Sequence, residues 1–401
     1  MANVSSSNGL EKRPKLRFPG FEKPWKVFTA EELFQNIVDK NHSDETVLTI
    51  VQGKGTLPRE QAGRNIHYDD ASLSNYKKVE PGDFIIHLRS FEGGLEMSNE
   101  AGIVSPAYTI LRCKKTHSSL FYDAYFHTDE FINHNLSKAV EGIRDGRQIS
   151  YAAFKWLGIP YCDPCEQKKI SDLLAVLNKR IAKQSDLVES LKKYKRGVLQ
   201  QAFSSERTKC NSRFPKWKPS YFGDYFTEQS IRTSNNTSTP LVSLTVEEGV
   251  TPKTERYYRE FLVTKSGENY KVIKPGWFAY NPMNAHLGAI APNHLGYTAA
   301  VSGYYNIFSV NEEDTICFWE DYLTSYQMLI HYKLIATGSL VEKQRVHYSQ
   351  FVKIHRCLPS IEEQKYLSKM FGIINAKITK AESMQQQLAR LRTSLMQQLF
   401  I

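Results

Sequence analysis

The chain has 401 residues, 41% of them hydrophobic, and a formal net charge of +10 at pH 7. This length allows two domains with cores of their own, and the composition excludes a largely disordered protein. Because the sequence has no apolar run of 18 or more residues and no signal-peptide pattern, we expect a soluble cytoplasmic protein rather than a membrane or secreted one.

The first 160 residues divide into a tail and a domain. Residues 1–15 are rich in Ser, Asn and charged side chains, and we predict a flexible tail. In residues 16–160, short runs of Val, Ile, Tyr and Phe alternate with Gly, Pro and Asn, which predicts β-strands and turns. Residues 205–357 have the same texture, so we predict two mixed α/β domains.

Residues 161–204 and 358–401 follow the two domains, and the second stretch repeats the first. Two motifs return at an offset of 197 residues with no gap between them: Glu166-Gln167-Lys168 as Glu363-Gln364-Lys365, and Gln200-Gln201-Ala202-Phe203 as Gln397-Gln398-Leu399-Phe400. A repeat at nearly half the chain length predicts one structural unit used twice.

Each copy predicts one long helix with a capped start. Asp163 and Ser360 occupy equivalent N-cap positions, and Glu166 and Glu363 follow three residues later, as in a capping box. Beyond the cap, apolar residues recur at alternating spacings of four and three, which indicates a heptad seam. We expect helix packing through Ile170, Leu174, Leu177, Ile181, Leu191, Val198, Leu367, Phe371, Ile374, Ile378, Leu388 and Leu395.

The heptad seam predicts that the two helices pack against each other. A helix of ~40 residues is about 60 Å long, and so narrow an apolar stripe needs a partner to be buried. The seam is interrupted at Gln184/Ala381 and Lys195/Arg392, beside which we expect Leu187/Met384 and Tyr194/Leu391 to take over. We predict an α+β fold with an intramolecular antiparallel coiled coil and a pseudo-twofold internal repeat.

Within the two domains, short shared stretches alternate with unlike ones. A Pro-Gly turn before a strand occurs at Pro81 and again at Pro275, and Arg17-Phe18-Pro19 returns as Arg213-Phe214-Pro215. Elsewhere the halves differ almost completely, which predicts one scaffold with two unlike surfaces. Since the sequence stops one residue after Phe400, we expect residues 10–25 to complete the end of the second helix and the termini to lie close together.

The sequence lacks the motifs of common catalytic sites. It contains neither G-x-x-x-x-G-K-[ST] nor G-x-G-x-x-G, so no nucleotide-binding loop is predicted. Cys162 and Cys165 have C-x2-C spacing, but a structural zinc site needs two further ligands. The other four cysteines are scattered singly. We therefore expect no catalytic residue, no metal and no cofactor on this chain.

Basic residues interleaved with aromatic ones remain on the predicted loops of both domains. Lys and Arg neutralise phosphates, while Arg and Asn form paired hydrogen bonds with base edges, although each single residue is as readily a solvated charge. The candidate DNA-binding residues are Lys54, Arg59, Arg64, His87, Arg89, Lys114, Arg147, Lys253, Arg256, Asn281, His286 and Arg345. Lys115, Arg144, Arg259, Lys271 and Lys343 are further candidates.

The alternation of an unlike domain and a repeated helix resembles the specificity (S) subunit of type I restriction–modification systems, over nearly the whole chain. The Glu-Gln-Lys helix starts, the helix ends at Phe203 and Phe400, and the Arg17 to Trp25 stretch carry the resemblance. The second half departs from the pattern at Trp277 and Gly303. The resemblance implies two target recognition domains that read an asymmetric bipartite DNA target, with the helices as a spacer.

The resemblance also implies a non-catalytic subunit of a larger complex. Its expected partners are double-stranded DNA, two methyltransferase (M) subunits and motor–nuclease (R) subunits, with S-adenosylmethionine, ATP and Mg on those subunits. Two alternatives stay open. One is a self-contained DNA methyltransferase or nuclease, which needs a cofactor loop or metal-binding carboxylates; the other is a coiled-coil adaptor that does not bind DNA.

Overall fold

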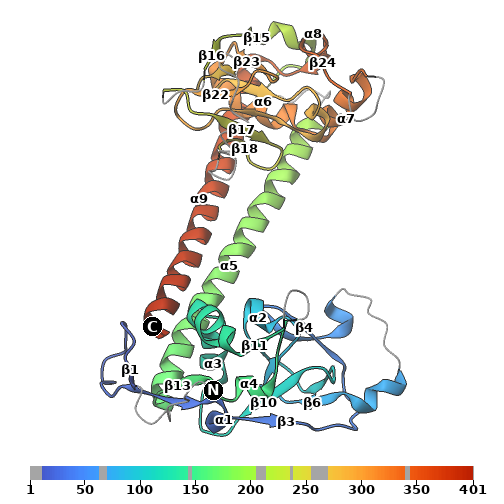
Figure 1. Ribbon diagram of the computed structural model, residues 1–401. Helices are drawn as coiled ribbons and strands as arrows, with labels where there is room; N and C mark the ends of the chain where they lie inside the picture. Colours follow the sequence, from blue (N-terminus) through green and yellow to red (C-terminus); the bar gives the residue numbers. More distant parts are fainter. Residues whose placement is uncertain are drawn as a thin grey trace. The chain divides into compact units, whose positions relative to one another are not determined.

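A computed structural model describes residues 11–62, 70–142, 147–204, 214–234, 238–253, 270–338 and 344–400 (Figure 1). The chain divides into two compact units. Met1–Ser185 and Ser383–Ile401 form the first, and Asp186–Glu382 the second. Both units mix helices with antiparallel sheets, as predicted. No helix among the described residues is apolar over a length that would span a membrane.

The first unit is built on a four-stranded antiparallel sheet of order β3-β10-β7-β8. Its core is aromatic, with the ring of Phe84 5.0 Å from Phe126 of helix α3. The strands are β1 (Glu11–Lys12), β2 (Trp25–Thr29), β3 (Phe34–Ile37), β4 (Leu48–Val51), β5 (Gly55–Pro58), β6 (Lys77–Val79), β7 (Phe84–Ile86), β8 (Glu96–Met97), β9 (Gly102–Val104), β10 (Thr109–Cys113), β11 (Val140–Glu141), β12 (Gln148–Ile149) and β13 (Gly158–Tyr161). The helices are α1 (Ala30–Leu33), α2 (Ser90–Gly93), α3 (Ser119–Phe126) and α4 (Tyr151–Phe154), with short turns η1 (Arg59–Ala62), η2 (Asp70–Asn75), η3 (Glu130–Asn135) and η4 (Leu136–Ala139).

The second unit repeats this topology. Its four-stranded sheet has the order β15-β23-β20-β21, and a β17–β18 hairpin corresponds to β4–β5. The strands are β14 (Lys218–Tyr221), β15 (Phe226–Gln229), β16 (Arg232–Thr233), β17 (Val242–Thr245), β18 (Gly249–Pro252), β19 (Tyr270–Ile273), β20 (Phe278–Tyr280), β21 (Ile290–Pro292), β22 (Ala299–Ser302), β23 (Asn306–Val310) and β24 (His355–Leu358). The helices are α6 (Ile316–Leu323), α7 (Tyr326–Ile335) and α8 (Tyr348–Phe351), with η7 (Phe222–Asp224), η10 (Ala285–Leu287) and η11 (Glu313–Thr315). The internal repeat predicted from the offset is confirmed at the level of fold.

Two helices of 40 residues each, α5 (Pro164–Phe203) and α9 (Ile361–Phe400), contribute to both units. In the first unit, Arg392 Nε donates to Asn178 Oδ1 at 2.8 Å, and Ile170 shares a core with Phe400. In the second unit, Lys192 Nζ lies 2.6 Å from Glu382 Oε1, and the ring centres of Phe203 and Phe371 lie 5.7 Å apart. Residue numbers rise on α5 as they fall on α9, so the segments pair antiparallel in each unit, as predicted.

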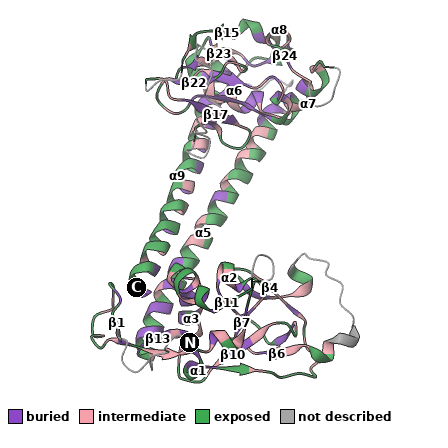
Figure 2. Ribbon diagram, viewed as in Figure 1, coloured by how far each residue is buried: buried purple, intermediate pink, exposed green. Residues whose placement is uncertain are grey.

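The predicted packing residues of the two helices differ in burial. Figure 2 shows buried residues gathered toward the helix ends and long exposed stretches between them. The following are buried: Ile170, Leu174, Leu177, Leu367, Phe371, Ile374, Ile378 and Leu388. The following are half-buried: Ile181, Leu191, Val198 and Leu395.

The expected takeover at the seam interruptions is wrong. Leu187, Tyr194, Met384 and Leu391 are exposed, with Tyr194 at 61%. The interrupting residues stay in the seam instead: Ala381 is buried, and Gln184, Lys195 and Arg392 are half-buried. The apolar pattern predicted the wrong residues because polar side chains at the interruptions remain between the helices, where they have partners within their own unit.

The helix starts are capped as predicted, but Glu166 has another role. Asp163 Oδ1 accepts from the N–H of Cys165 at 2.8 Å, and Ser360 Oγ accepts from the N–H of Glu363. The buried Glu166 carboxylate does not close a capping box. It accepts two hydrogen bonds from the Arg17 guanidinium, at 2.9 and 2.8 Å, and one from the Trp25 indole at 3.1 Å.

The second helix start repeats this attachment. Trp217 Nε1 donates to Glu363 Oε2 at 3.2 Å. The glutamine next in sequence acts alike in both copies, because Gln167 Nε2 donates to the carbonyl of Cys162 and Gln364 Nε2 to that of Pro359, both at 3.0 Å. The repeated Glu-Gln pair therefore fixes each helix to the domain that precedes it.

The N-terminal segment is more ordered than the predicted tail of residues 1–15. Residues 1–10 lie outside the described residues, but Glu11 and Lys12 form β1, which pairs with β2. The N–H of Leu16 donates to the carbonyl of Gln398 at 3.0 Å. The N-terminal segment thus meets the end of α9, as expected for residues 10–25.

We predict that Glu166→Leu lowers the free energy of unfolding by about 3 kcal/mol, because the buried indole of Trp25 and the half-buried guanidinium of Arg17 lose their acceptor. Urea unfolding followed by tryptophan fluorescence measures this. Lys168→Ala is the matched control, since it removes only an exposed pair with Asp172 and changes stability by less than about 1 kcal/mol. Equal stability of Glu166→Leu and the unsubstituted protein would contradict the attachment.

Candidate nucleic-acid interface

Each unit places a cation directly after the second strand of its hairpin. Arg59 follows β5, and its N–H donates to the carbonyl of Val47 at 3.1 Å. Lys253 follows β18, and its N–H donates to the carbonyl of Leu241 at 3.5 Å. Both residues are half-buried. Two sequence candidates therefore occupy the same backbone position in the two copies of the fold.

A second matched pair of cations lies on β6 and β19. Lys77 Nζ donates to the carbonyl of Tyr108, and Lys271 Nζ donates to the carbonyl of Tyr305 at 2.8 Å. Burial lowers the pKa of both lysines. Each lysine uses one ammonium N–H for this bond and has two more for an anion.

Sequence reasoning named Lys271 but missed Lys77. The signal was present, because Lys77 precedes Lys271 by the same 194 residues that separate Arg59 from Lys253. The two long helices repeat at an offset of 197 residues instead. A comparison of the two halves at that single offset therefore does not align Lys77 with Lys271.

The β4–β5 turn is fixed by a buried carboxylate that sequence reasoning also missed. Glu96 Oε1 accepts from the N–H of Gly53 at 2.7 Å, and Oε2 accepts from the N–H of Gly55 at 2.9 Å. The φ angles of these glycines are 73° and 77°, a region that L-side chains rarely adopt. The exposed Lys54 lies between them, on a turn of defined shape.

His127 holds the other side of Glu96, with Nε2 3.2 Å from Oε1. Burial raises the pKa of Glu96, but the hydrogen bonds from His127 and Gly53 outweigh it and leave the pKa below its ordinary value. Burial likewise lowers the pKa of His127, and its hydrogen bonds to Glu96 and to the carbonyl of Asp123, with the charges of both acids, raise the pKa above its ordinary value. The Glu96 carboxylate therefore holds the turn and is itself held by the His127 imidazole.

Two further candidates of the first unit lie at helix α2, next to this turn. A Cβ on Gly93 of α2 would come within 1.5 Å of Gln52 Nε2, so the helix touches the turn. Arg89 is exposed at the start of α2, and the guanidinium of the exposed Arg147 lies 4.4 Å from the ring centre of Phe91. Lys54, Arg89 and Arg147 thus come from neighbouring loops.

The other candidates are placed in several ways. His87 is half-buried, and burial lowers its pKa. Lys114 Nζ donates to the carbonyl of Glu31 in α1, away from the hairpin (Figure 1). Asn281 Oδ1 accepts from the N–H of Met283 and shapes its own turn. Arg64 and Arg256 lie outside the described residues.

His286 and Arg345 complete the second unit's candidates. His286 is half-buried on η10. Arg345 pairs with Thr337 through two backbone hydrogen bonds of 2.9 Å, and its guanidinium lies 5.6 Å from the ring centre of Tyr304. Within the described part of the chain, no group of three or more His, Cys, Asp or Glu side chains is placed to hold a metal ion.

No protein-family model and no curated protein matches the sequence. Solved structures do match. The S subunit of a type I restriction–modification system from M. genitalium has a TM-score of 0.58 and 12% identity, covering 97% of this chain and 99% of that one. The chain has the fold of a type I restriction–modification S subunit.

A second solved structure supports the same fold. It concerns complex assembly and conformational transition of the type I R-M system, and its matching chain has a TM-score of 0.53 at 13% identity. The match covers 96% of this chain and 99% of that one. The fold likeness therefore includes both units and both long helices.

Proposed function

We propose that this chain is the DNA specificity subunit of a type I restriction–modification complex, and that it reads an asymmetric bipartite target with its two domains. One observation carries the proposal: the fold occurs twice with cations at matched backbone positions, but with unlike side chains around them. Arg59 and Lys253 form one matched pair, and Lys77 and Lys271 the other. The fold likeness to an S subunit supports it.

The matched cations and the unlike loops have different tasks in this proposal. Phosphate contacts are the same for every sequence and set the position of a protein on the duplex, whereas base contacts differ with the target. Matched cations suit phosphates. Unlike loops, such as the one with Lys54, Arg89 and Arg147 in the first domain, suit two different half-sites.

The two long helices act as the spacer between the half-sites. Each helix contributes residues to both units, and each unit contains an antiparallel segment of the pair. A continuous helix has a defined rise of about 1.5 Å per residue. The number of residues in α5 and α9 therefore sets the gap between half-sites.

Exposed apolar residues on the helices support the recruitment of protein partners. Val176, Leu187 and Tyr194 of α5 are exposed and lie 11 and 7 residues apart, close to whole numbers of turns, so they share one face. Ile373, Met384 and Leu391 repeat these positions on α9 and are exposed too. Two equivalent faces suit two copies of one partner, and we assign them to two methyltransferase subunits.

The chemistry of the complex belongs to its partners. S-adenosylmethionine is bound by the methyltransferase subunits, and ATP and Mg by the motor–nuclease subunits that join them. The chain itself is non-catalytic in this proposal. Methyl transfer to DNA by the purified chain alone, or DNA cleavage by it, would instead support the self-contained enzyme.

We predict that the full chain selects, from a random duplex library, two unlike sequence blocks with one fixed gap. Removal of residues 181–187 from α5 and of the facing residues 385–391 from α9 shortens the gap, because each helix loses about 10 Å. Sequencing of the selected duplexes measures this. An unchanged gap would exclude the spacer role, and selection of no motif by the unshortened chain would favour the adaptor that does not bind DNA.

We predict that Arg59→Gln combined with Lys253→Gln weakens binding to the selected duplex and to unrelated duplexes by a similar factor. The slope of log affinity against log salt concentration falls by about 0.9 for each lost phosphate contact. Fluorescence titration at several salt concentrations measures both. Lys168→Gln, on the exposed face of α5, is the matched control. A change in the selected sequence would contradict the assignment to phosphates.

We predict that Tyr194→Glu combined with Leu391→Glu lowers the affinity for the methyltransferase subunit by about 100-fold, since a charge on each apolar face opposes burial. DNA binding by the chain itself is unchanged. Co-purification and titration with the methyltransferase subunit test this. Lys193→Glu, one residue away on α5, adds the same charge outside the face and retains assembly. Retained assembly by the double variant would exclude these faces.

A further inference from the structure

Each long helix keeps one cation within its seam, at the same position of the repeat. Lys195 lies in α5 and Arg392 in α9, and both are half-buried rather than exposed. Exposed apolar residues lie next to them, so sequence alone predicts that the cations face solvent. A cation at such a site loses solvation free energy and needs a partner.

In the second unit, the partner of Lys195 comes from the recognition domain. Lys195 Nζ lies 2.6 Å from Oδ1 of Asp321, a residue of α6 that is 4% exposed. Oδ2 of Asp321 is buried without a hydrogen-bond partner among the residues that the structure describes. The helix that follows the first domain is thereby tied to the second domain.

The pair does not act mainly as a source of stability. Burial raises the pKa of Asp321 to about 6, against the opposing effect of Lys195. The effect of burial on the pKa of Asp321 is thus larger than the opposing effect of Lys195. Apolar residues of similar volume commonly replace a buried ion pair without loss of stability. The Lys195–Asp321 pair, which leaves one oxygen unsatisfied, therefore fixes the orientation of α5 relative to α6 more than it stabilises the fold.

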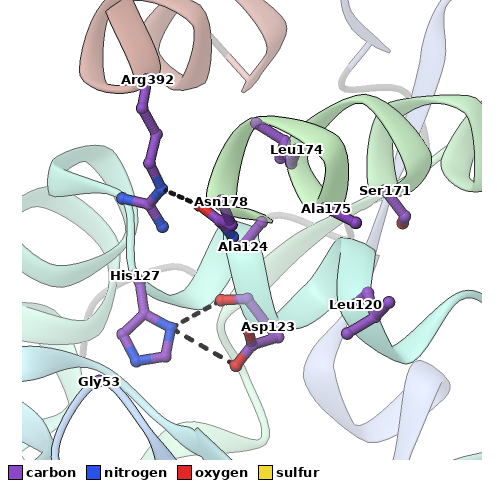
Figure 3. A pocket seen from close by; sticks show the side chains of 10 residues that line it. All are labelled: Gly53, Leu120, Asp123, Ala124, His127, Ser171, Leu174, Ala175, Asn178 and Arg392. Carbon is purple, nitrogen blue, oxygen red and sulfur yellow. Dashed lines mark hydrogen bonds and ion pairs between the residues drawn. The ribbon is translucent and has the colours of Figure 1, made fainter. Parts of the chain in front are cut away.

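In the first unit, Arg392 has the equivalent place (Figure 3). Its Nε donates to Asn178 Oδ1 at 2.8 Å, and its guanidinium lines a cavity of about 330 Å³ together with Asp123 and His127. Burial raises the pKa of Asp123, and the charges of His127 and Arg392 oppose that rise. Arg392 thus shares a cavity with an acid of α3, whereas Lys195 contacts an acid of α6 directly.

Each cation lines a cavity that the hairpin of its unit also lines. In the first unit, His127 Nδ1 lies 3.6 Å from Asp123 Oδ1, its Nε2 binds Glu96, and Glu96 holds the turn with Gly53 and Gly55. In the second unit, Lys195 and Asp321 line a cavity of about 420 Å³ that Thr245 to Val250 of the β17–β18 hairpin also line. Each cation thus borders a hairpin from which we expect DNA contacts.

We propose that Lys195 and Arg392 are positioning residues that orient each DNA-contacting hairpin on the paired helices, each helix serving the domain of the other half. The inference rests on the proposed function. It predicts that, after loss of either cation, the chain still selects the same two half-site sequences but accepts more than one gap length between them.

The test uses the full chain and a random duplex library. Lys195→Met combined with Asp321→Leu removes the buried pair. We expect an unfolding midpoint at or above that of the unsubstituted protein, the same two sequence blocks, and two or more gap lengths where the unsubstituted chain selects one. Affinity for the original duplex falls about tenfold or more, the scale of one lost well-placed contact. The exchange Lys195→Glu with Asp321→Lys restores the single gap.

Arg392 of the first unit gives an independent test. This test remains valid if the Lys195 and Asp321 variants of the second unit fail to fold. Arg392→Met leads to the selection of two or more gap lengths. Arg392→Lys keeps the positive charge, and its selected duplexes retain a single gap length. A single gap with unchanged affinity in Arg392→Met, or in the folded Lys195→Met/Asp321→Leu protein, would overturn the inference. Selection of no two-block motif by the unsubstituted chain would overturn the proposed function instead.

Discussion

A buried glutamate at the start of each long helix is the attachment on which the rest of the structure depends. Glu166 accepts from the indole of Trp25, and Glu363 accepts from that of Trp217. A buried carboxylate without donors is costly, so the helix start and the entering segment are stable only together. The strength of a hydrogen bond also depends on its geometry, whereas an apolar contact has little directional preference. The axis of each helix is therefore fixed relative to the strand that carries its tryptophan, and every residue further along the helix takes its place from there.

The helix ends are attached by aromatic packing, in the unit that holds the other helix's start. Phe400 lies 5.2 Å from Phe121 and 6.3 Å from Trp25, measured between ring centres. Phe203 lies 5.3 Å from Tyr322 in the second unit. Trp25 thus contacts both the start of α5, through Glu166, and the end of α9. This double use explains why the sequence repeats the beginning and the end of each helix most clearly: both are buried in a domain, while the middle is largely exposed.

The sequence predicted what depends on local pattern and on comparison of the two halves. The offset predicted the repeated fold, and the cap residues Asp163 and Ser360 predicted the helix starts. It did not predict what depends on distant partners. Lys195 stays in the seam because Asp321 lies opposite, more than a hundred residues away in the chain, whereas Tyr194 beside it is exposed. The candidate interface was predicted in part, since Arg59 and Lys253 lie at matched positions, but Lys114 binds a backbone carbonyl instead.

The two domains differ in how they hold equivalent segments, and this difference bears on how a target is chosen. Glu96 of the first domain binds the hairpin turn, while Ala291 occupies the equivalent strand position in the second domain. A carboxylate accepts from two backbone N–H groups at once, and an alanine methyl group accepts from none. At this position of the shared scaffold, the first domain has a charged group that holds its turn and the second domain has an uncharged one. If the hairpins contact DNA as proposed, a substitution of Glu96 behind the first turn will alter the preferred half-site through the shape of that turn.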